Sequence, residues 1–210
     1  MVFMPDWVDP TIESIESTAD LIVSGKWHKA FPHGVDEIAV VDERWKPKNA
    51  EHQDLIDFWT DRKSQRPDNL FTSRMVDPTA IGKVLSKILL LDVADDGFDA
   101  RYRVYGTGIS SMVGKDWTGK LVSEMNRSVR SNQALFYRAC YRAVFRTAKP
   151  LYTHHQPLSW IDASAWKRLI LPVHDEAGEK IVRFLVCNLA EKGRELSSQE
   201  WKLLHDQRYS

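Results

Sequence analysis

The pattern of hydrophobic and polar positions divides the chain near residue 50. Beyond that point apolar residues recur at helical or strand spacing, and turn-forming residues mark the boundaries. Before it, tryptophans and prolines are scattered without a sustained period. We therefore interpret residues 1–50 as an extension that packs on a core domain of residues 51–190, and residues 191–210 as a short C-terminal helix.

The core domain has the pattern of an antiparallel α+β fold. Helices are predicted over residues 51–63, 77–85, 107–114 and 129–148. Strands are predicted over residues 88–93, 98–105, 151–158, 165–173 and 180–189, and a short apolar run at 38–41 in the extension is a further candidate. Because runs of strands alternate with runs of helices, the order favours an antiparallel sheet with helices on one face.

Charge and hydropathy narrow the classes of function. The chain has 29 Lys and Arg against 29 Asp and Glu, so its net charge is zero. Since a neutral chain has no strong attraction for a polyanion, we expect no nucleic-acid partner. No export signal and no bilayer-spanning apolar stretch is evident, so we expect a cytoplasmic protein with no membrane contact.

Motifs for catalysis or metal binding are missing from the sequence. Two cysteines, Cys140 and Cys187, are too few for a disulfide framework or a four-cysteine zinc site. The seven histidines form no metal-binding motif, and Gly106-Thr107-Gly108 reads as a tight strand-to-helix corner rather than a phosphate cradle. We therefore expect a protein that is not an enzyme.

Several short segments, in their order and spacing, resemble one protein family. They are Leu55-Ile56-Asp57-Phe58-Trp59, Asp77-Pro78, Lys87 to Val93, Arg101 to Thr107, Val113 to Lys120, Lys149-Pro150 and Arg168 to Val173. Over residues 54–190 the chain resembles the PAS domains common in alphaproteobacteria that were once catalogued as a domain of unknown function. The first 50 residues lie outside this resemblance.

The resemblance implies a five-stranded antiparallel sheet with a pocket between sheet and helices. PAS domains sense small molecules or mediate dimerisation and partner contacts. Oxygen-sensing members carry the haem histidine on the long helix, but residues 129–148 contain none. Flavin-binding members carry a reactive cysteine in a motif that neither cysteine here matches. We expect neither haem nor flavin, and either no cofactor or an unknown small ligand.

The register of the last hairpin assigns the predicted pocket. If its turn pairs Val173 with Val182, Leu171 faces Phe184 and Leu169 faces Val186 on one apolar side of the sheet. That side and the long helix would line the pocket. The candidate ligand-binding residues are Tyr102, Phe136, Cys140, Leu169, Leu171 and Phe184, with His154 or His155 as a polar contact.

The reverse side of the sheet is the predicted contact surface. It would carry Arg101, Arg103, Trp166, Arg168 and Arg183, covered by the helix that bears Leu55, Phe58 and Trp59. We expect this helix and face to form a homodimer, and residues 1–50 are the alternative cover. The predicted function is a sensory or regulatory module that binds a small molecule and signals through a partner protein or self-association. The alternative is a ligand-free adaptor.

Overall fold

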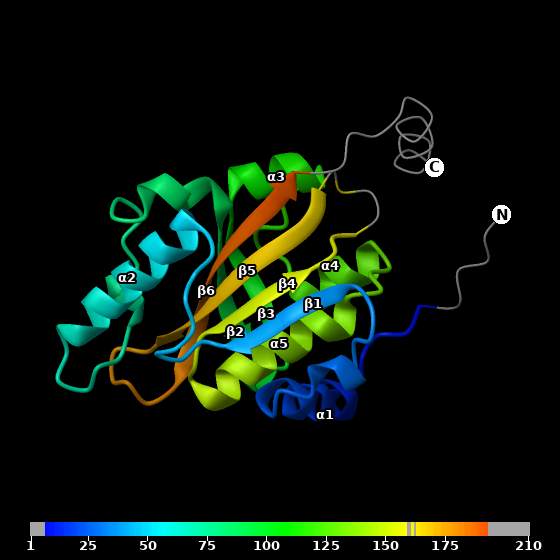
Figure 1. Cartoon of the computed structure of the whole chain (residues 1–210), viewed down its shortest axis with the longest axis horizontal. Helices are drawn as coiled ribbons and strands as arrows, with labels where there is room; N and C mark the ends of the chain where they lie inside the picture. Colours follow the sequence, from blue (N-terminus) through cyan, green and yellow to red (C-terminus); the bar gives the residue numbers. More distant parts are fainter. Residues whose placement is uncertain (1–6, 159–160, 162, 193–210) are drawn as a thin grey trace.

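The computed structural model describes residues 7–158, 161 and 163–192, and the predicted C-terminal helix lies outside these residues (Figure 1). The α-helices are α1 (Ile12–Val23), α2 (Ala50–Ser64), α3 (Thr107–Val113), α4 (Val122–Ser128) and α5 (Ala134–Thr147). Short 3-10 helices are η1 (Trp27–Lys29), η2 (Ser73–Met75), η3 (Gly82–Lys87) and η4 (Asp95–Gly97). The strands are β1 (Val35–Val40), β2 (Ile88–Ala94), β3 (Asp99–Tyr105), β4 (Leu151–His155), β5 (Ala163–His174) and β6 (Ile181–Lys192).

All strands of the described chain join one antiparallel sheet in the order β1-β4-β5-β6-β2-β3. The sheet has six strands, so the expected number of five is wrong. The sixth strand is β1, which comes from the N-terminal extension and pairs with β4, with Ile38 opposite Thr153. The extension therefore protects an edge that would otherwise expose unpaired backbone groups.

The sheet has two faces, and each is covered by helices (Figure 1). We call the side under α3, α4 and α5 the inner face, where Leu91, Ile170 and Phe184 enter a large apolar cluster. We call the side under α2 the outer face, where Leu169, Leu171 and Leu185 enter a second cluster. The two clusters follow from the side-chain alternation of central strands buried on both sides.

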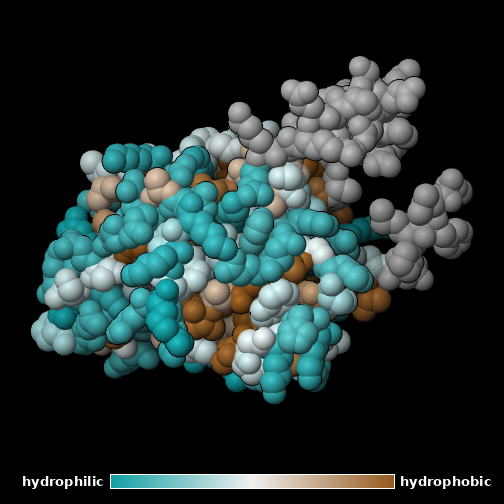
Figure 2. Space-filling model, viewed as in Figure 1, coloured by the Kyte–Doolittle hydropathy of each residue, from teal (hydrophilic) through white to brown (hydrophobic). Residues whose placement is uncertain are grey.

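Helix α2 covers the outer face within the same chain. Its Leu55 and Trp59 are buried in the outer cluster, and the Trp59 indole donates a hydrogen bond to the Pro172 carbonyl at 3.2 Å. Figure 2 shows a mainly hydrophilic surface on the side in view. The apolar set of this helix is thus buried without a second copy, so it no longer argues for a dimer.

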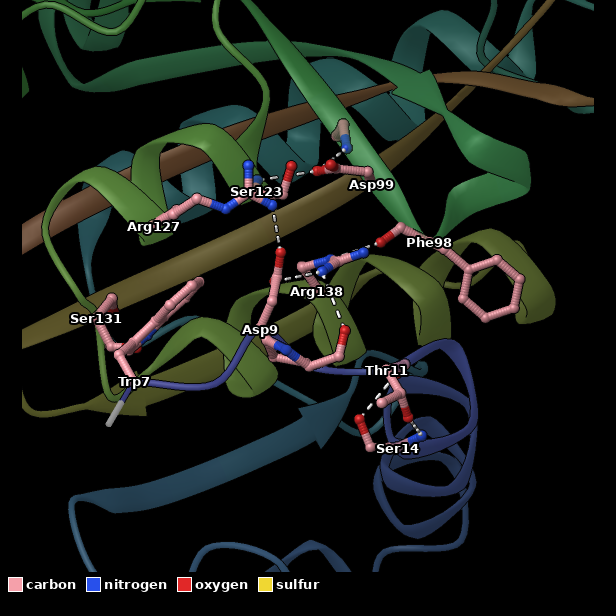
Figure 3. Close-up of polar contacts among 12 residues, drawn as sticks. Trp7, Asp9, Thr11, Ser14, Phe98, Asp99, Ser123, Arg127, Ser131 and Arg138 are labelled. Carbon is pink, nitrogen blue, oxygen red and sulfur yellow. Dashed lines mark hydrogen bonds and ion pairs between the residues drawn. The ribbon is translucent and has the colours of Figure 1, made fainter. Parts of the chain in front are cut away.

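The N-terminal segment and α1 pack against α5. Thr11 caps α1 by accepting a hydrogen bond from the Ser14 amide at 3.1 Å, a typical helix start. Ahead of the helix, Asp9 bridges Arg127 and Arg138 at 2.6 and 3.1 Å (Figure 3). Along α5, charged residues continue the contact, with the pairs Arg142–Glu16, Arg146–Glu16 and Arg146–Asp20.

Two predicted helices are wrong in their bounds. The long helix begins at Ala134 rather than residue 129. Arg130 has a positive φ of 45°, and this conformation interrupts the helix between α4 and α5. Over residues 77–85 no α-helix forms. The Asp77 carboxylate accepts a hydrogen bond from the Thr79 amide at 2.9 Å, which closes a local turn. The 3-10 helix η3 follows this turn.

Candidate functional site

A cavity of about 50 Å³ lies between the inner face and the helices that cover it. Its lining comes from strands β2, β3, β5 and β6, helices α3, α4 and α5, and the segment before β5. The residues are Leu89, Tyr102, Tyr105, Ile109, Val113, Met125, Tyr137, Leu158, Ile161, Trp166, Arg168 and Asn188. This composition, mostly apolar and aromatic with a few polar groups, is typical of small-molecule sites.

Larger hollows differ in their chemistry. A hollow of about 300 Å³ shares Trp166 and Asn188 with the cavity but does not include Arg168, and its charged residues Glu51 and Lys87 pair with each other at 2.6 Å. Another of about 490 Å³ is lined by Arg62, Arg66, Arg74 and Glu176 among others. Its charged side chains are half-exposed or exposed, and they form surface ion pairs such as Arg74–Glu176 at 3.9 Å. Since such pairs contribute little and are open to water, we place the candidate site in the inner cavity.

Arg168 is the distinguishing group of this cavity. It lies on β5 opposite Thr153 of β4 and Asn188 of β6, near the middle of the sheet, and it is only 3% exposed. Its Nη2 donates a hydrogen bond to the Tyr141 hydroxyl at 2.5 Å. Its guanidinium lies 4.9 Å from the centre of the Tyr137 ring, within cation–π range. These contacts fix the orientation of a buried positive charge.

The charge of Arg168 has no counter-charge among the described residues, since no carboxylate there lies within ion-pair distance of its guanidinium. Its Nη1 and Oδ1 of Asn188 are buried, and neither atom has a hydrogen-bond partner in the part of the chain that the structure describes. Burial acts to lower the pKa of Arg168, but Tyr141 and Tyr137 outweigh it and raise the pKa, so the group stays charged. A buried charge without a partner costs several kcal/mol.

The other polar groups around the cavity are neutral. Burial raises the pKa of Tyr102, Tyr105 and Tyr137 well above the usual range of tyrosine, so their hydroxyls keep their protons. Burial, assisted by the charge of Arg168, lowers the pKa of His155 well below its usual value. The region therefore presents one fixed positive charge and several neutral hydrogen-bonding groups.

The predicted register of the last hairpin is wrong by one residue. The strands pair Val173 with Arg183 and Leu171 with Leu185, so the expected Leu171–Phe184 pair does not form. Leu169 and Leu171 consequently point into the outer cluster, whereas Phe184 lies in the inner cluster, stacked on Tyr141 at 5.1 Å. The single-residue shift reverses every side chain of β5 relative to the prediction.

The remaining predicted pocket residues divide among three places. Tyr102 lines the cavity, and Phe136 and Cys140 are buried beside it in the inner cluster. His155 also lies on the inner face, 4.5 Å from the Phe136 ring. His154 points the opposite way, with its ring nitrogens near Asp36 and Glu191. The structure thus separates the two histidines, as alternation along a strand requires.

The predicted outer-face residues divide as well. Trp166 and Arg168 lie on the inner face and line the cavity, because of the same register shift. Arg103 and Arg183 remain on the outer side, where both pair with Asp92 of β2 at 2.8 to 2.9 Å, rather than with the aspartates of α2. Burial raises the pKa of Asp92, but these two arginines outweigh it and lower the pKa.

The other three predicted contact residues and Arg101 are placed as follows. Arg101 donates to the Gly119 carbonyl at 2.7 Å. Leu55 and Trp59 of α2 are buried against the outer face. Phe58 of the same helix is partly buried, and its ring centre lies 5.8 Å from that of Phe71. These side chains pack within the chain, so their role in a dimer remains a prediction.

Of the twelve lining residues, sequence reasoning placed only Tyr102 in the pocket; it assigned Trp166 and Arg168 to the outer face and named none of the other nine as pocket residues. A bulge at Arg103 of β3, opposite Leu90 and Leu91 of β2, shifts the pairing, so Tyr105 joins Tyr102 on the inner face, with the ring centres 5.1 Å apart. The sequence does not single out Arg168, because Lys167 directly precedes it in the same strand and is charged as well.

Metal and thiol chemistry find little support in the described part of the chain. There, no three His, Cys, Asp or Glu side chains come close enough together to hold a metal ion. Burial raises the pKa of both Cys140 and Cys187 to about 12, so these thiols are poor nucleophiles at neutral pH. At the Gly106-Thr107-Gly108 corner, a Cβ on Gly106 would lie 2.4 Å from the Ser86 carbonyl oxygen, so close packing explains this glycine.

No helix in the described residues is both long and apolar enough to cross a membrane.

Comparison with known proteins identifies a family for most of the domain. A family model described as PAS domain matches residues 47–187. A search of curated proteins finds no match. Among solved structures, the chain is similar to one titled "Structure of an RNA-binding Light-Oxygen-Voltage Receptor", at 12% identity and a TM-score of 0.41. The alignment covers 94% of this chain and 52% of that one, so the chain spans about half of that structure.

This comparison corrects one expectation. The neutral charge led us to exclude nucleic-acid partners, and we withdraw that exclusion; the solved structure is titled as an RNA-binding receptor, which is a statement about that protein. Overall neutrality is a weak criterion, because it says nothing of how charges are distributed over a surface.

The family match agrees with the antiparallel sheet, the helices over its inner face and the cavity between them. It covers well over half of the chain and contains all the cavity-lining residues except Asn188, which lies one position beyond it. The chain belongs to the PAS domain family.

Proposed function

We propose that this chain is a sensory or regulatory module that binds a small molecule in the inner cavity and signals through a partner protein or self-association. The observation that carries the proposal is the pair of buried, unpartnered polar atoms, Arg168 Nη1 and Asn188 Oδ1, on residues that line this cavity. Membership of a family of sensory modules supports it. Buried atoms without partners also occur away from the cavity, as at Asn126 and Tyr152, but those groups are neutral. Arg168 adds a buried charge, which a purely structural core would pair or replace with an apolar group.

The small volume of the cavity supports a second candidate, the ligand-free adaptor. A cavity of about 50 Å³ is far below the roughly 300 Å³ at which drug-sized ligand sites begin. In the adaptor, ordered water alone would occupy this space. The two functions differ in one observable, which is whether an organic molecule fills the cavity.

Mass spectrometry of the gently denatured, purified protein distinguishes the two candidates. The sensor predicts a stoichiometric small molecule that is released on denaturation. Val113→Phe at the end of α3 fills the cavity from one wall and should remove that molecule. Met112→Phe, the same change one residue away and outside the lining, is the matched control and should retain it. A wild-type protein without a bound molecule, and without stabilisation by any small molecule screened, would support the adaptor.

A further inference from the structure

We propose that the ligand of the inner cavity is a short-chain organic acid whose carboxylate pairs with Arg168. The inference rests on the proposed function and specifies its ligand class. It starts from a charge on the inner side of the central strand β5 that the described residues leave without a counter-charge. A ligand carboxylate supplies the missing negative charge and accepts the free Nη1–H in one step.

The surroundings of Arg168 orient it for such an anion. The Tyr141 hydroxyl holds Nη2, and the ring of Tyr137 lies under the guanidinium, so the free Nη1 edge has a fixed direction. Asp9 and Glu16 of the helical layer are already paired with arginines, and the buried Asp99 of β3 accepts the backbone amides of Ala100 and Ser123. The tyrosine and asparagine groups that line the cavity can donate to the second carboxylate oxygen.

The rest of the cavity defines the remainder of the ligand. Leu89, Ile109 and Val113 form an apolar wall that fits an alkyl group rather than a second charge. A volume of about 50 Å³ equals about four water-sized spheres, each of roughly 10–15 Å³. A molecule of about four or five non-hydrogen atoms, such as acetate or propionate, matches both the size and the polarity.

The test compares acids with their neutral isosteres. Wild-type protein is titrated with sodium acetate and sodium propionate, and with acetamide and propionamide at matched ionic strength, by thermal unfolding and calorimetry. The acids should raise Tm by roughly 5–10 °C at about 100 times their Kd, and the amides should not. Arg168→Met should weaken acid binding by roughly 30-fold or more. Arg103→Met, on the outer side of the same sheet, is the matched control and should leave it unchanged.

The outcomes separate this inference from the proposed function. If the amides bind as well as the acids, or the co-purified molecule is uncharged, the anion assignment is wrong while a ligand-binding sensor stands. If a larger carboxylate co-purifies and depends on Arg168, the charge assignment holds and the size limit is wrong. If no acid or amide binds and no molecule co-purifies, water fills the cavity and both proposals are wrong. Should Arg168→Met fail to fold, the acid-against-amide comparison in wild-type protein still decides.

Discussion

The two faces of the sheet are both buried under helices, but they differ in the polar groups they enclose. On the outer face, Leu169, Leu171 and Leu185 pack beneath α2, and the polar atoms that lack partners there, such as His52 Nδ1 and Tyr152 Oη, belong to neutral groups. On the inner face, the described residues leave a buried positive charge, that of Arg168, without a counter-charge beside a cavity. We infer from this difference that the outer face stabilises the fold, while the inner face provides a cavity and the charge of Arg168 for a ligand.

The first prediction tests the stabilising role of the outer face by creating a cavity in the outer cluster. Leu171 is fully buried there, so Leu171→Ala should lower the free energy of unfolding by about 2–5 kcal/mol. Urea unfolding measures this value. Val104→Ala, at an exposed position of β3, should change it by less than about 0.5 kcal/mol. Ligand affinity of the folded Leu171→Ala protein should not change, and a large change would mean that the two faces are not independent.

A second prediction concerns pH and His52, also beneath the outer face. Burial lowers the pKa of His52 to about 4, from an ordinary value near 6.5. Since the unfolded state then binds more protons below pH 6.5, stability should fall as the pH drops from about 6.5 towards 4. At pH 5, the neutral buried His52 should lower the free energy of unfolding by roughly 2 kcal/mol relative to its value near neutral pH.

Unfolding of wild-type protein and His52→Gln at pH 7 and pH 5 checks this effect. The variant should lose less stability between the two values than wild-type does. His155 has its pKa lowered in the same direction, so part of the pH dependence should persist in the variant. An equal loss in both proteins would show that His52 is not buried in its neutral form.

The third prediction sharpens the contrast from the inner side. Tyr141→Phe removes the acceptor of the buried Arg168 charge and should cost about 1.5–3 kcal/mol of unfolding free energy. Arg168→Met removes the charge itself and should be neutral or stabilising in the ligand-free protein. In the double variant, the cost of the tyrosine change should therefore shrink markedly. Additive effects in this double-mutant cycle would contradict a direct Arg168–Tyr141 coupling.

The smallest expected effect lies in the helical layer outside the inner face. Glu16→Gln weakens the ion pairs to Arg142 and Arg146, which are partly exposed, and should cost about 0.5–1 kcal/mol. Glu43→Gln in the exposed segment before α2 is the control, with a change near zero. High salt should reduce the difference between the two variants. A cost above that of Leu171→Ala would mean that α1 holds the fold together rather than covering it.

The sequence was sufficient for the five strands of the core domain and for helices α2, α3 and α5, because hydrophobic periodicity and turn residues mark these elements; it placed a helix at 77–85 that does not form. It was not sufficient for the faces. The turn of the last hairpin left the register ambiguous by one residue, and that shift moved Leu169 and Leu171 away from the cavity and brought Arg168 and Trp166 to it. Alternation in β5 is weak evidence, since both faces of a central strand are buried and both are largely apolar.

Two other features depend on contacts distant in sequence. The bulge in β3 that turns Tyr105 inward has no local signature. The sixth strand pairs residues of the extension with β4, more than 100 positions away, so the short apolar run at 38–41 alone could not fix it. The adjacent Lys167 and Arg168 are both charged, and only the structure shows that Arg168 is the one on the buried inner face.

The most direct test of the account locates the ligand itself. Filtered nuclear Overhauser measurements on protein with carbon-13-labelled acetate report which side chains touch the ligand methyl group. The account predicts contacts to the methyl groups of Ile109 and Leu89 and the ring of Tyr105, all lost in Arg168→Met. Contacts to Leu55 and Ile81 instead, in the hollow beside α2, or contacts that survive the loss of Arg168, would contradict it.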